Sequence, residues 1–310
     1  MFLKNKNSSI QEVSFSEIEG KKVQLFIKRE DKLHHFISGN KYRKLKYNLE
    51  EAKRLKHHTL ITFGGAYSNH IAAAAAAGFE FGFKVIGVIR GDELANKLDE
   101  VLVHNPTLKF ASEHNMQFEF VSRSDYREKT SSAFIQKLKN KYGNFYLVPE
   151  GGTNELAVKG CEEILTEEDS IYNVVCSAIG TGGTISGLIN SLKPHQKVLG
   201  FPALKGDFLQ NEIKKYVLTS KNWSLNTDYS FGGYGKISEE LILFINKFKQ
   251  ETGIPLDPVY TGKMVFGIVD LIKKDYFPER TKLLAIHTGG LQGIDGMNSI
   301  LKKKKLPIIA

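Results

Sequence analysis

A glycine-rich segment at residues 180–184 has the composition of an anion-binding turn. Gly180, Thr181, Gly182, Gly183 and Thr184 follow an apolar, strand-like run and precede a helix-like one. Glycines let successive backbone N–H groups converge on one anion, a helix N-terminus adds partial positive charge, and threonine hydroxyls donate hydrogen bonds. The segment predicts a phosphate cup, with a plain strand-to-helix turn as the alternative. It lacks the lysine of a P-loop and the glycine spacing of a dinucleotide fingerprint, so nucleotide binding is weakly indicated.

The segment S-G-N-K-Y-R-K-L at residues 38–45 contains a lysine suited to covalent chemistry. Lys41 follows a Gly-Asn turn and precedes a helical pattern with leucines at helical spacing. We expect its cationic neighbours Arg43 and Lys44, together with the helix N-terminus, to lower the pKa of the Lys41 amine and make it nucleophilic. The alternative is an ordinary solvated surface lysine.

A third segment, F-G-G-A-Y-S-N-H at residues 63–70, joins an apolar strand to an alanine-rich helix. Ser68 and Asn69 are expected at the N-terminus of that helix. There they act as N-caps or, with the free N–H groups, bind a substrate carboxylate. His70 ranks below them, because a lone histidine is more often structural than catalytic.

Two late segments add further polar residues, D-P-V-Y-T-G-K at 257–263 and L-A-I-H-T-G-G at 284–290. The second is typical of a strand that enters a small-residue loop, where ligands collect in open α/β sheets. Thr288 could offer a neutral hydroxyl to a ring nitrogen. Taken alone, Thr288 is more simply a turn threonine and Tyr260 a core tyrosine.

The elements that must position these residues alternate between strand-like and helical patterns, which predicts an α/β fold with parallel strands. A first series has strands at 59–63, 83–89 and 118–121, and a closely packed alanine helix at 72–77 that Gly78 ends. The second series has, in order, a helix at 153–166, a strand at 173–177, a helix at 181–192, a strand at 198–201, helices at 239–252 and 262–273, and a strand at 282–286.

Composition narrows the class of protein. The 310 residues are 41% hydrophobic and 25% charged, which is ordinary for a globular chain that buries a large core. There is no signal-like start and no apolar run of roughly 18 residues, so a cytoplasmic protein without a membrane segment is expected.

Cys161 and Cys176 lack metal-site spacing and are predicted to be buried free thiols, with no metal. The net charge of +9 raises nucleic-acid binding as a minor hypothesis, but lysines are scattered and only 302–305 form a dense run.

Six segments together, K-R-E-D at residues 28–31 and the five described above, resemble in order the D-cysteine desulfhydrase and 1-aminocyclopropane-1-carboxylate deaminase family. The resemblance spans residues 28–290. It implies the two-lobed, tryptophan-synthase-β-like fold (type II) of pyridoxal-phosphate enzymes, with parallel-rich twisted sheets flanked by helices. The larger, cofactor-binding lobe would comprise residues 1–41 plus 149–310, and the smaller lobe residues 42–148. A homodimer is implied as well.

The resemblance also implies a role for each site residue. The cofactor is pyridoxal 5′-phosphate, with Lys41 as its Schiff-base lysine, Asn69 at its 3′ oxygen, Thr288 at its pyridine nitrogen, and Gly180, Thr181, Gly182, Gly183 and Thr184 around its phosphate. The substrate carboxylate would lie on Ser68, Asn69 and His70, and Tyr260 would face the reacting carbons. Lys41, Ser68 and Tyr260 would be the catalytic residues. A hydroxyl partner leaves the pyridine nitrogen unprotonated, which favours elimination over transamination.

The implied reaction converts a small D-amino acid to a 2-oxo acid and ammonia. D-Cysteine desulfhydrase, which forms pyruvate, sulfide and ammonia, is the first candidate, because S-N-H and Y-T-G-K resemble the desulfhydrases. The deaminases have glutamine at the position of His70 and are associated with a second tyrosine at the position of Ala285. 1-Aminocyclopropane-1-carboxylate deaminase is the second candidate.

Two further alternatives stay open. The substrate could be another β-substituted amino acid, because the loop with Glu150 cannot be matched closely to the family. A non-catalytic phosphate-ligand-binding protein is the alternative from a different class.

Overall fold

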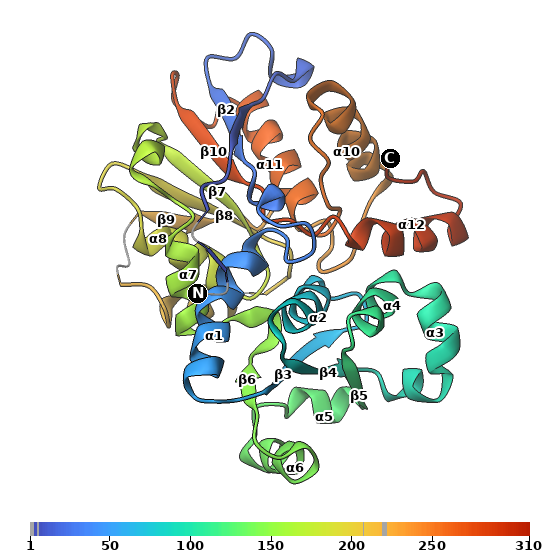
Figure 1. The fold of residues 1–310 in the computed structure, drawn as a ribbon. Coiled ribbons are helices and arrows are strands. Elements are labelled where there is room, and N and C mark those ends of the chain that lie inside the picture. Colours follow the sequence, from blue (N-terminus) through green and yellow to red (C-terminus); the bar gives the residue numbers. More distant parts are fainter. Residues whose placement is uncertain (1–2, 5, 207, 219–221) are drawn as a thin grey trace.

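The computed structural model describes residues 3–4, 6–206, 208–218 and 222–310. Two sheets organise the chain, and helices surround each of them (Figure 1). Among the described helices, none combines the length and the apolar character needed to cross a bilayer.

The larger sheet has six strands in the order β1-β2-β10-β7-β8-β9. β1 is antiparallel to β2, and every other neighbouring pair is parallel. The strands are β1 (Ile10–Glu12), β2 (Gln24–Lys28), β7 (Val174–Ile179), β8 (Lys197–Pro202), β9 (Trp223–Leu225) and β10 (Lys282–Ile286).

The smaller sheet has four parallel strands in the order β5-β4-β3-β6. They are β3 (Thr59–Gly65), β4 (Lys84–Arg90), β5 (Gln117–Val121) and β6 (Tyr146–Val148). Both sheets carry buried apolar clusters on their two faces, which explains the nearly continuous apolar runs of the strands. The predicted α/β class with parallel-rich sheets is confirmed.

Twelve α-helices connect and cover the strands in the described part of the chain (Figure 1). They are α1 (Asn40–Arg54), α2 (Asn69–Phe81), α3 (Leu98–His104), α4 (Pro106–Glu113), α5 (Arg123–Arg127), α6 (Ser132–Tyr142), α7 (Glu155–Glu162), α8 (Gly183–Asn190), α9 (Phe208–Lys214), α10 (Glu239–Thr252), α11 (Thr261–Lys273) and α12 (Gly293–Lys303). The expected helices at 153–166 and 181–192 are shorter in the structure, and they begin after the N-cap Asn154 and after Gly182, respectively. α1, which the prediction assigns mainly to the smaller lobe, packs against α7, which it assigns to the larger lobe. The predicted lobe boundaries stay a proposal.

The prediction that Gly78 ends the alanine helix is wrong. α2 continues to Phe81, and Gly82 ends it with a left-handed backbone at φ 75°. Gly78 lies inside the helix, where an added Cβ would come 2.0 Å from Cγ2 of Val85 on β4. The missing side chain therefore permits close helix–sheet packing instead of a helix stop.

The parallel topology places the predicted functional segments at one edge of each sheet. β3 ends at Gly65 before α2, β7 ends at Ile179 before the 180–184 turn, and β10 ends at Ile286 before the H-T-G-G loop. Ligands of open α/β sheets bind outside the carboxyl ends of the strands. The fold thus brings loops far apart in sequence to one region.

Candidate active site

Lys41 lies in the first turn of α1, directly beside the glycine-rich turn. Its Nζ donates a hydrogen bond to Oδ1 of Asn40 at 2.8 Å, and Nδ2 of Asn40 donates to Oγ1 of Thr184 at 2.8 Å. Asn40 therefore connects the lysine to the predicted phosphate cup. Sequence analysis missed Asn40 as a site residue, although its place next to Lys41 was visible.

The electrostatic setting of Lys41 favours a neutral, nucleophilic amine. Burial, followed by the positive charge of Lys44, lowers its pKa from 10.5 to about 7, although Cys161 and Asp257 act in the opposite sense. The prediction that Arg43 contributes is wrong, because its guanidinium faces Glu30 in a buried ion pair with Nε 2.8 Å from Oε2. Arg43 is thus a structural residue.

Lys44 supplies the positive charge that the glycine-rich turn itself lacks. Its buried ammonium donates to the backbone oxygen of Gly151 at 3.1 Å and to Oγ1 of Thr153 at 2.9 Å, and it lies 3.4 Å from Oγ1 of Thr181. Burial lowers the pKa of Lys44, and in the described part of the chain no carboxylate forms an ion pair with it.

A buried cation that faces threonine hydroxyls and glycine amides is the donor set that an anionic phosphate requires. A Cβ placed on Gly183 would lie 3.2 Å from Nζ of Lys44, so the turn needs glycine at this approach. The residues present fit the phosphate of the predicted cofactor. The signal for Lys44 was available in the sequence, since positions i and i+3 share one face of a helix.

The H-T-G-G loop after β10 packs directly against the loop that precedes Lys41. The amide of Asn40 donates to the backbone oxygen of Thr288 at 3.2 Å. A Cβ on Gly39 would lie 2.0 Å from that oxygen, and one on Gly290 would lie 2.8 Å from Nδ2 of Asn69. The loop thus packs the backbone of Thr288 against the residues that precede Lys41, and it packs Gly290 against Asn69.

The N-terminus of α2 faces the same region. Ser68 is its N-cap, and its hydroxyl accepts from the amide of Ile71 at 3.4 Å. The first turn of any helix leaves its amides without intrahelical acceptors, so the N–H groups of Asn69 and His70 are suited to an anion.

The ring of His70 has a defined protonation state. The hydroxyl of Thr62 donates to the backbone oxygen of Val148, so it accepts from Nε2 of His70 at 2.7 Å. Burial, followed by the charges of Lys41 and Lys44, holds the pKa of His70 well below 6.5, and the ring is neutral. Its buried Nδ1 is an acceptor with no partner in the described structure. An anion would therefore meet the backbone amide of His70 and not its ring.

Tyr260 lies over the glycine-rich turn and is rigidly held. A Cβ on Gly180 would lie 3.3 Å from the phenol oxygen of Tyr260. Oδ2 of Asp257 accepts from the amide of Tyr260 at 2.9 Å, while Oδ1 accepts from the amide and the hydroxyl of Thr261. Burial raises the pKa of Tyr260 well above 10.0, so the phenol is neutral.

A second tyrosine, Tyr234, comes from the loop at residues 226–237. Its ring centroid is 6.1 Å from that of Tyr260, and the two rings meet edge to face. Sequence analysis missed this residue, because an aromatic residue in an irregular glycine-rich loop gives no periodic signal.

Ala285 is fully buried in β10, between Ile27 and Cys176 of the neighbouring strands, and packs in the apolar core. Tyr260 packs against the same core cluster. The structure also provides a second phenol at Tyr234, whose ring centroid is 6.1 Å from that of Tyr260. The argument from Ala285 against the deaminase stays a prediction.

Glu150 lies outside the group of residues around Lys41. Oε1 of Glu150 accepts from the hydroxyl of Tyr126 at 2.8 Å, and Oε2 pairs with Nζ of Lys129 at 3.2 Å. These bonds attach the P-E-G-G-T loop to α5 and the residues after it. Next to Glu150, Gly151 and Gly152 adopt positive φ, and the loop turns there toward Lys44.

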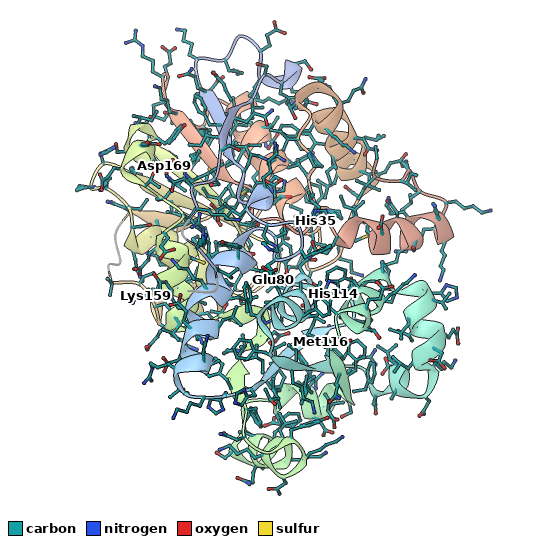
Figure 2. The ribbon with its side chains drawn as sticks, in the orientation of Figure 1. His35, Glu80, His114, Met116, Lys159 and Asp169 are labelled. Carbon is teal, nitrogen blue, oxygen red and sulfur yellow. The ribbon has the colours of Figure 1, made fainter. Side chains whose placement is uncertain are left out.

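The K-R-E-D segment is a set of structural ion pairs. Lys28 pairs with Asp169, Arg29 pairs with Asp31, and Glu30 pairs with Arg43. Asp169 lies in the part of the molecule that holds the six-stranded sheet, far from Met116 next to the smaller sheet (Figure 2). The segment therefore supports the site without contributing a reacting group. Cys161 and Cys176 are buried free thiols, as predicted.

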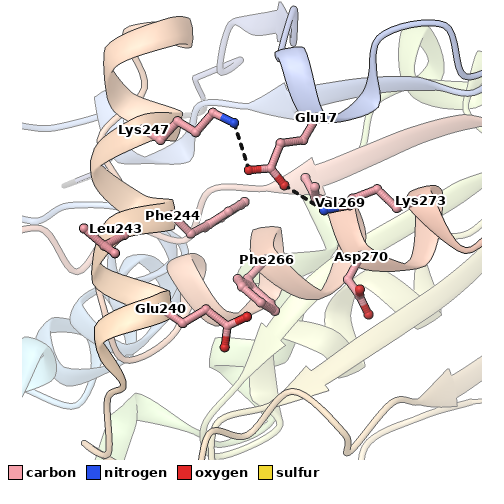
Figure 3. Close-up of a pocket in the computed structure, with 9 residues that line it drawn as sticks. All are labelled: Glu17, Glu240, Leu243, Phe244, Lys247, Phe266, Val269, Asp270 and Lys273. Atoms are coloured by element: carbon pink, nitrogen blue, oxygen red, sulfur yellow. Dashed lines mark hydrogen bonds and ion pairs between the residues drawn. The ribbon is translucent and has the colours of Figure 1, made fainter.

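A surface pocket of about 360 Å³ lies between α10 and α11, away from the site (Figure 3). The carboxylate of Glu17 bridges Lys247 and Lys273 at 3.1 Å each on one side of it. None of the residues around Lys41 lines this pocket.

Comparisons with known proteins agree with this geometry. Residues 8–289 match the model of a family described as "Pyridoxal-phosphate dependent enzyme". A protein of Pyrococcus furiosus named "Putative 1-aminocyclopropane-1-carboxylate deaminase" is 32% identical over 293 residues, which cover 87% of this chain and 86% of that protein.

Two further proteins extend the comparison. The "Bifunctional D-cysteine desulfhydrase/1-aminocyclopropane-1-carboxylate deaminase, mitochondrial" of Arabidopsis thaliana is 32% identical, over 90% of this chain and 76% of that protein. A crystal structure described as an ACC deaminase homologue superposes with a TM-score of 0.76 at 31% identity, covering 94% of this chain and 92% of that one. The chain belongs to the family of pyridoxal-phosphate-dependent enzymes.

Proposed function

We propose that this enzyme converts a small D-amino acid and water to a 2-oxo acid and ammonia. D-Cysteine, which gives pyruvate, ammonia and hydrogen sulfide, is the first candidate substrate. 1-Aminocyclopropane-1-carboxylate, which gives 2-oxobutanoate and ammonia, is the second. One observation carries the proposal. The amine of Lys41 has a lowered pKa, and it lies beside Lys44 and the glycine-rich turn at residues 180–184. Two neutral phenols, those of Tyr260 and Tyr234, come from the same group of loops.

The residues that would hold the cofactor follow from the same geometry and from the family resemblance. Lys41 would carry pyridoxal 5′-phosphate covalently, while Lys44 and the turn from Gly180 to Thr184 would hold its phosphate. Asn69 would contact the 3′ oxygen, and Thr288 the pyridine nitrogen. When bound, the cofactor supplies an electron sink for the pair of electrons left at Cα after deprotonation.

The chain's own residues would then divide the remaining work. Lys41, held by Asn40, would accept the Cα proton at Nζ, since its lowered pKa suits a base near neutral pH. Ser68 and the amides of Asn69 and His70 would bind the substrate carboxylate at the positive end of α2. Tyr260 and Tyr234 would lie at the reacting carbons. Both phenols are neutral, so each could donate a proton there.

Two features of the chain favour D-cysteine over the cyclopropane substrate. S-N-H at residues 68–70 and Y-T-G-K at residues 260–263 both resemble the desulfhydrases, whereas the deaminases have glutamine at His70. The pair formed by Tyr260 and Tyr234 keeps the deaminase activity as the second candidate, although Ala285 stands where the deaminases are associated with a second tyrosine.

The test is to purify the protein with pyridoxal 5′-phosphate, record its near-visible spectrum, and assay keto acid and sulfide with each substrate. We expect a yellow protein whose cofactor is fixed by borohydride at Lys41, and sulfide with pyruvate from D-cysteine. Lys41→Ala should abolish both the fixation and the activity. Keto acid from the cyclopropane substrate alone would establish the second candidate. If Lys41 binds no cofactor, the proposal fails, and a non-catalytic phosphate-binding protein would take its place.

We also keep the homodimer and the cytoplasmic location as proposals, because both rest on resemblance and composition. Sedimentation of the purified protein measures the first, and a monomer at micromolar concentration would contradict it.

A further inference from the structure

The loop that carries Tyr234 is attached to α11 by a buried lysine. Nζ of Lys263 donates to the backbone oxygen of Ser230 at 2.8 Å and to that of Gly233 at 2.8 Å. The same two oxygens accept the turn hydrogen bonds from the amides of Gly233 and Lys236. One ammonium group thus holds both ends of the turn that precedes Tyr234.

The surroundings of Lys263 indicate that holding this loop is its main interaction. The side chain is among the largest fully buried ones in the protein, and in the described part of the chain no carboxylate forms an ion pair with it. The charge of Asp257 acts on Lys263, but backbone amides and Thr261 occupy its oxygens. A buried cation without a counterion is costly, so its two carbonyl bonds are needed to retain it.

Apart from Lys263, the loop is anchored near its start, where the hydroxyl of Tyr229 donates to Oδ2 of Asp270 on α11 at 2.6 Å. Its backbone has positive φ at Phe231, Gly232, Gly233 and Gly235, so four of five successive residues lie outside the usual conformations. The ring of Phe231 packs edge-on against Phe266 of α11 at 5.0 Å. This contact fixes the start of the turn, whereas Tyr234 is half exposed and lies beyond it.

We infer that Lys263 is a positioning residue, which holds the loop at residues 226–237 through Ser230 and Gly233 so that the phenol of Tyr234 stays against Tyr260. Lys263 lies in the first turn of α11, and Tyr260 is the N-cap of that helix, so one end of the helix presents one phenol and fixes the loop that brings the other. The part of this inference that concerns catalysis rests on the proposed function, whereas the attachment of the loop does not.

The direct test is hydrogen exchange of the amides in residues 226–237, measured in wild-type protein, Lys263→Met and Lys46→Met. Methionine keeps the length of the side chain and removes the donors. Lys46 is the matched control, because it is equally buried but lies on α1, away from the loop. Its Nζ pairs with Oε1 of Glu163 at 2.7 Å. We expect exchange at Gly233 and Lys236 to become about 10- to 100-fold faster in Lys263→Met only, because bonds from a charged donor contribute that much to an equilibrium constant. Unchanged exchange would overturn the inference.

A double-mutant cycle with Tyr234→Phe tests the link to Tyr234. If Lys263 acts through Tyr234, Lys263→Met lowers kcat in the wild-type background and has little further effect in Tyr234→Phe. Effects on kcat that simply multiply would overturn the positioning role. If neither substrate is turned over by wild-type protein, the proposed function fails, and hydrogen exchange alone still decides whether Lys263 holds the loop.

Discussion

At the scale of single residues, the site depends on two lysines one helical turn apart with different tasks. The pKa of Lys41 is lowered to about 7, while Nζ of Lys44 donates hydrogen bonds to Thr153 and to Thr181 of the glycine-rich turn. The charge of Lys44 also lowers the pKa of Lys41, so we expect one residue both to bind the phosphate and to activate its neighbour.

The first prediction concerns the pH dependence of cofactor attachment. The neutral amine is the nucleophile, so the rate at which apoprotein reacts with pyridoxal 5′-phosphate should rise with pH through about 7 and then level off. In Lys44→Met the midpoint should move to higher pH, because the charge that disfavours protonated Lys41 is gone. Stopped-flow absorbance measures both profiles.

The same variant should bind the cofactor about 10- to 100-fold more weakly, since a charged hydrogen bond to the phosphate is lost. Lys46→Met serves as the control and should change neither the midpoint nor the affinity. An unshifted midpoint in Lys44→Met would show that burial alone sets the pKa of Lys41.

At the scale of elements, α2 shows how small side chains set a helix against a sheet. The alanines allow the helix to lie close to the smaller sheet, and Gly78 makes its closest approach at Val85. The N-terminus of α2, which carries Ser68 and Asn69, is aimed at the site by this packing.

We predict that Gly78→Ala destabilises the protein by about 1–3 kcal/mol, because its Cβ overlaps Val85 and forces the helix outward. Gly82→Ala meets no atom within 4 Å and should cost only about 1 kcal/mol, from the left-handed backbone. Urea unfolding compares the two. Equal losses would mean that the α2–β4 contact is looser than the structure shows.

At the scale of the whole molecule, buried ion pairs join segments distant in sequence around the site. Lys28 at the end of β2 contacts Asp169 with Nζ 2.7 Å from Oδ2, and the two side chains are 3% and 1% exposed. The amide of Thr166 also donates to Asp169 at 2.7 Å. The pair connects the N-terminal strand to the segment before β7.

Lys28→Met should lower the free energy of unfolding by about 3–5 kcal/mol, because it leaves the carboxylate of Asp169 buried without its cation. Lys28→Met combined with Asp169→Asn should recover much of this loss, since no unpaired charge remains. Thermal unfolding in the presence of the cofactor measures both. A double variant as unstable as the single one would show that lost packing, not charge, dominates.

By itself, the sequence determined the fold class, the order of most elements and the segments of the site. Periodic apolar patterns identified β3, β4, β7, β8, β10 and α10, since local residue spacing sets which face is buried. Glycines and small polar residues after strands identified the 180–184 turn and the S-N-H segment, because such loops face ligands in α/β sheets.

Only the tertiary structure decided which charged and aromatic side chains share a space. Arg43 and Lys44 are adjacent in sequence, yet one joins a structural ion pair and the other faces the cup. Tyr234 and Lys263 became visible as partners of Tyr260 and of the loop only through contacts between distant segments. Burial and charge at a site depend on every element packed around it, and local spacing along the chain does not specify that packing.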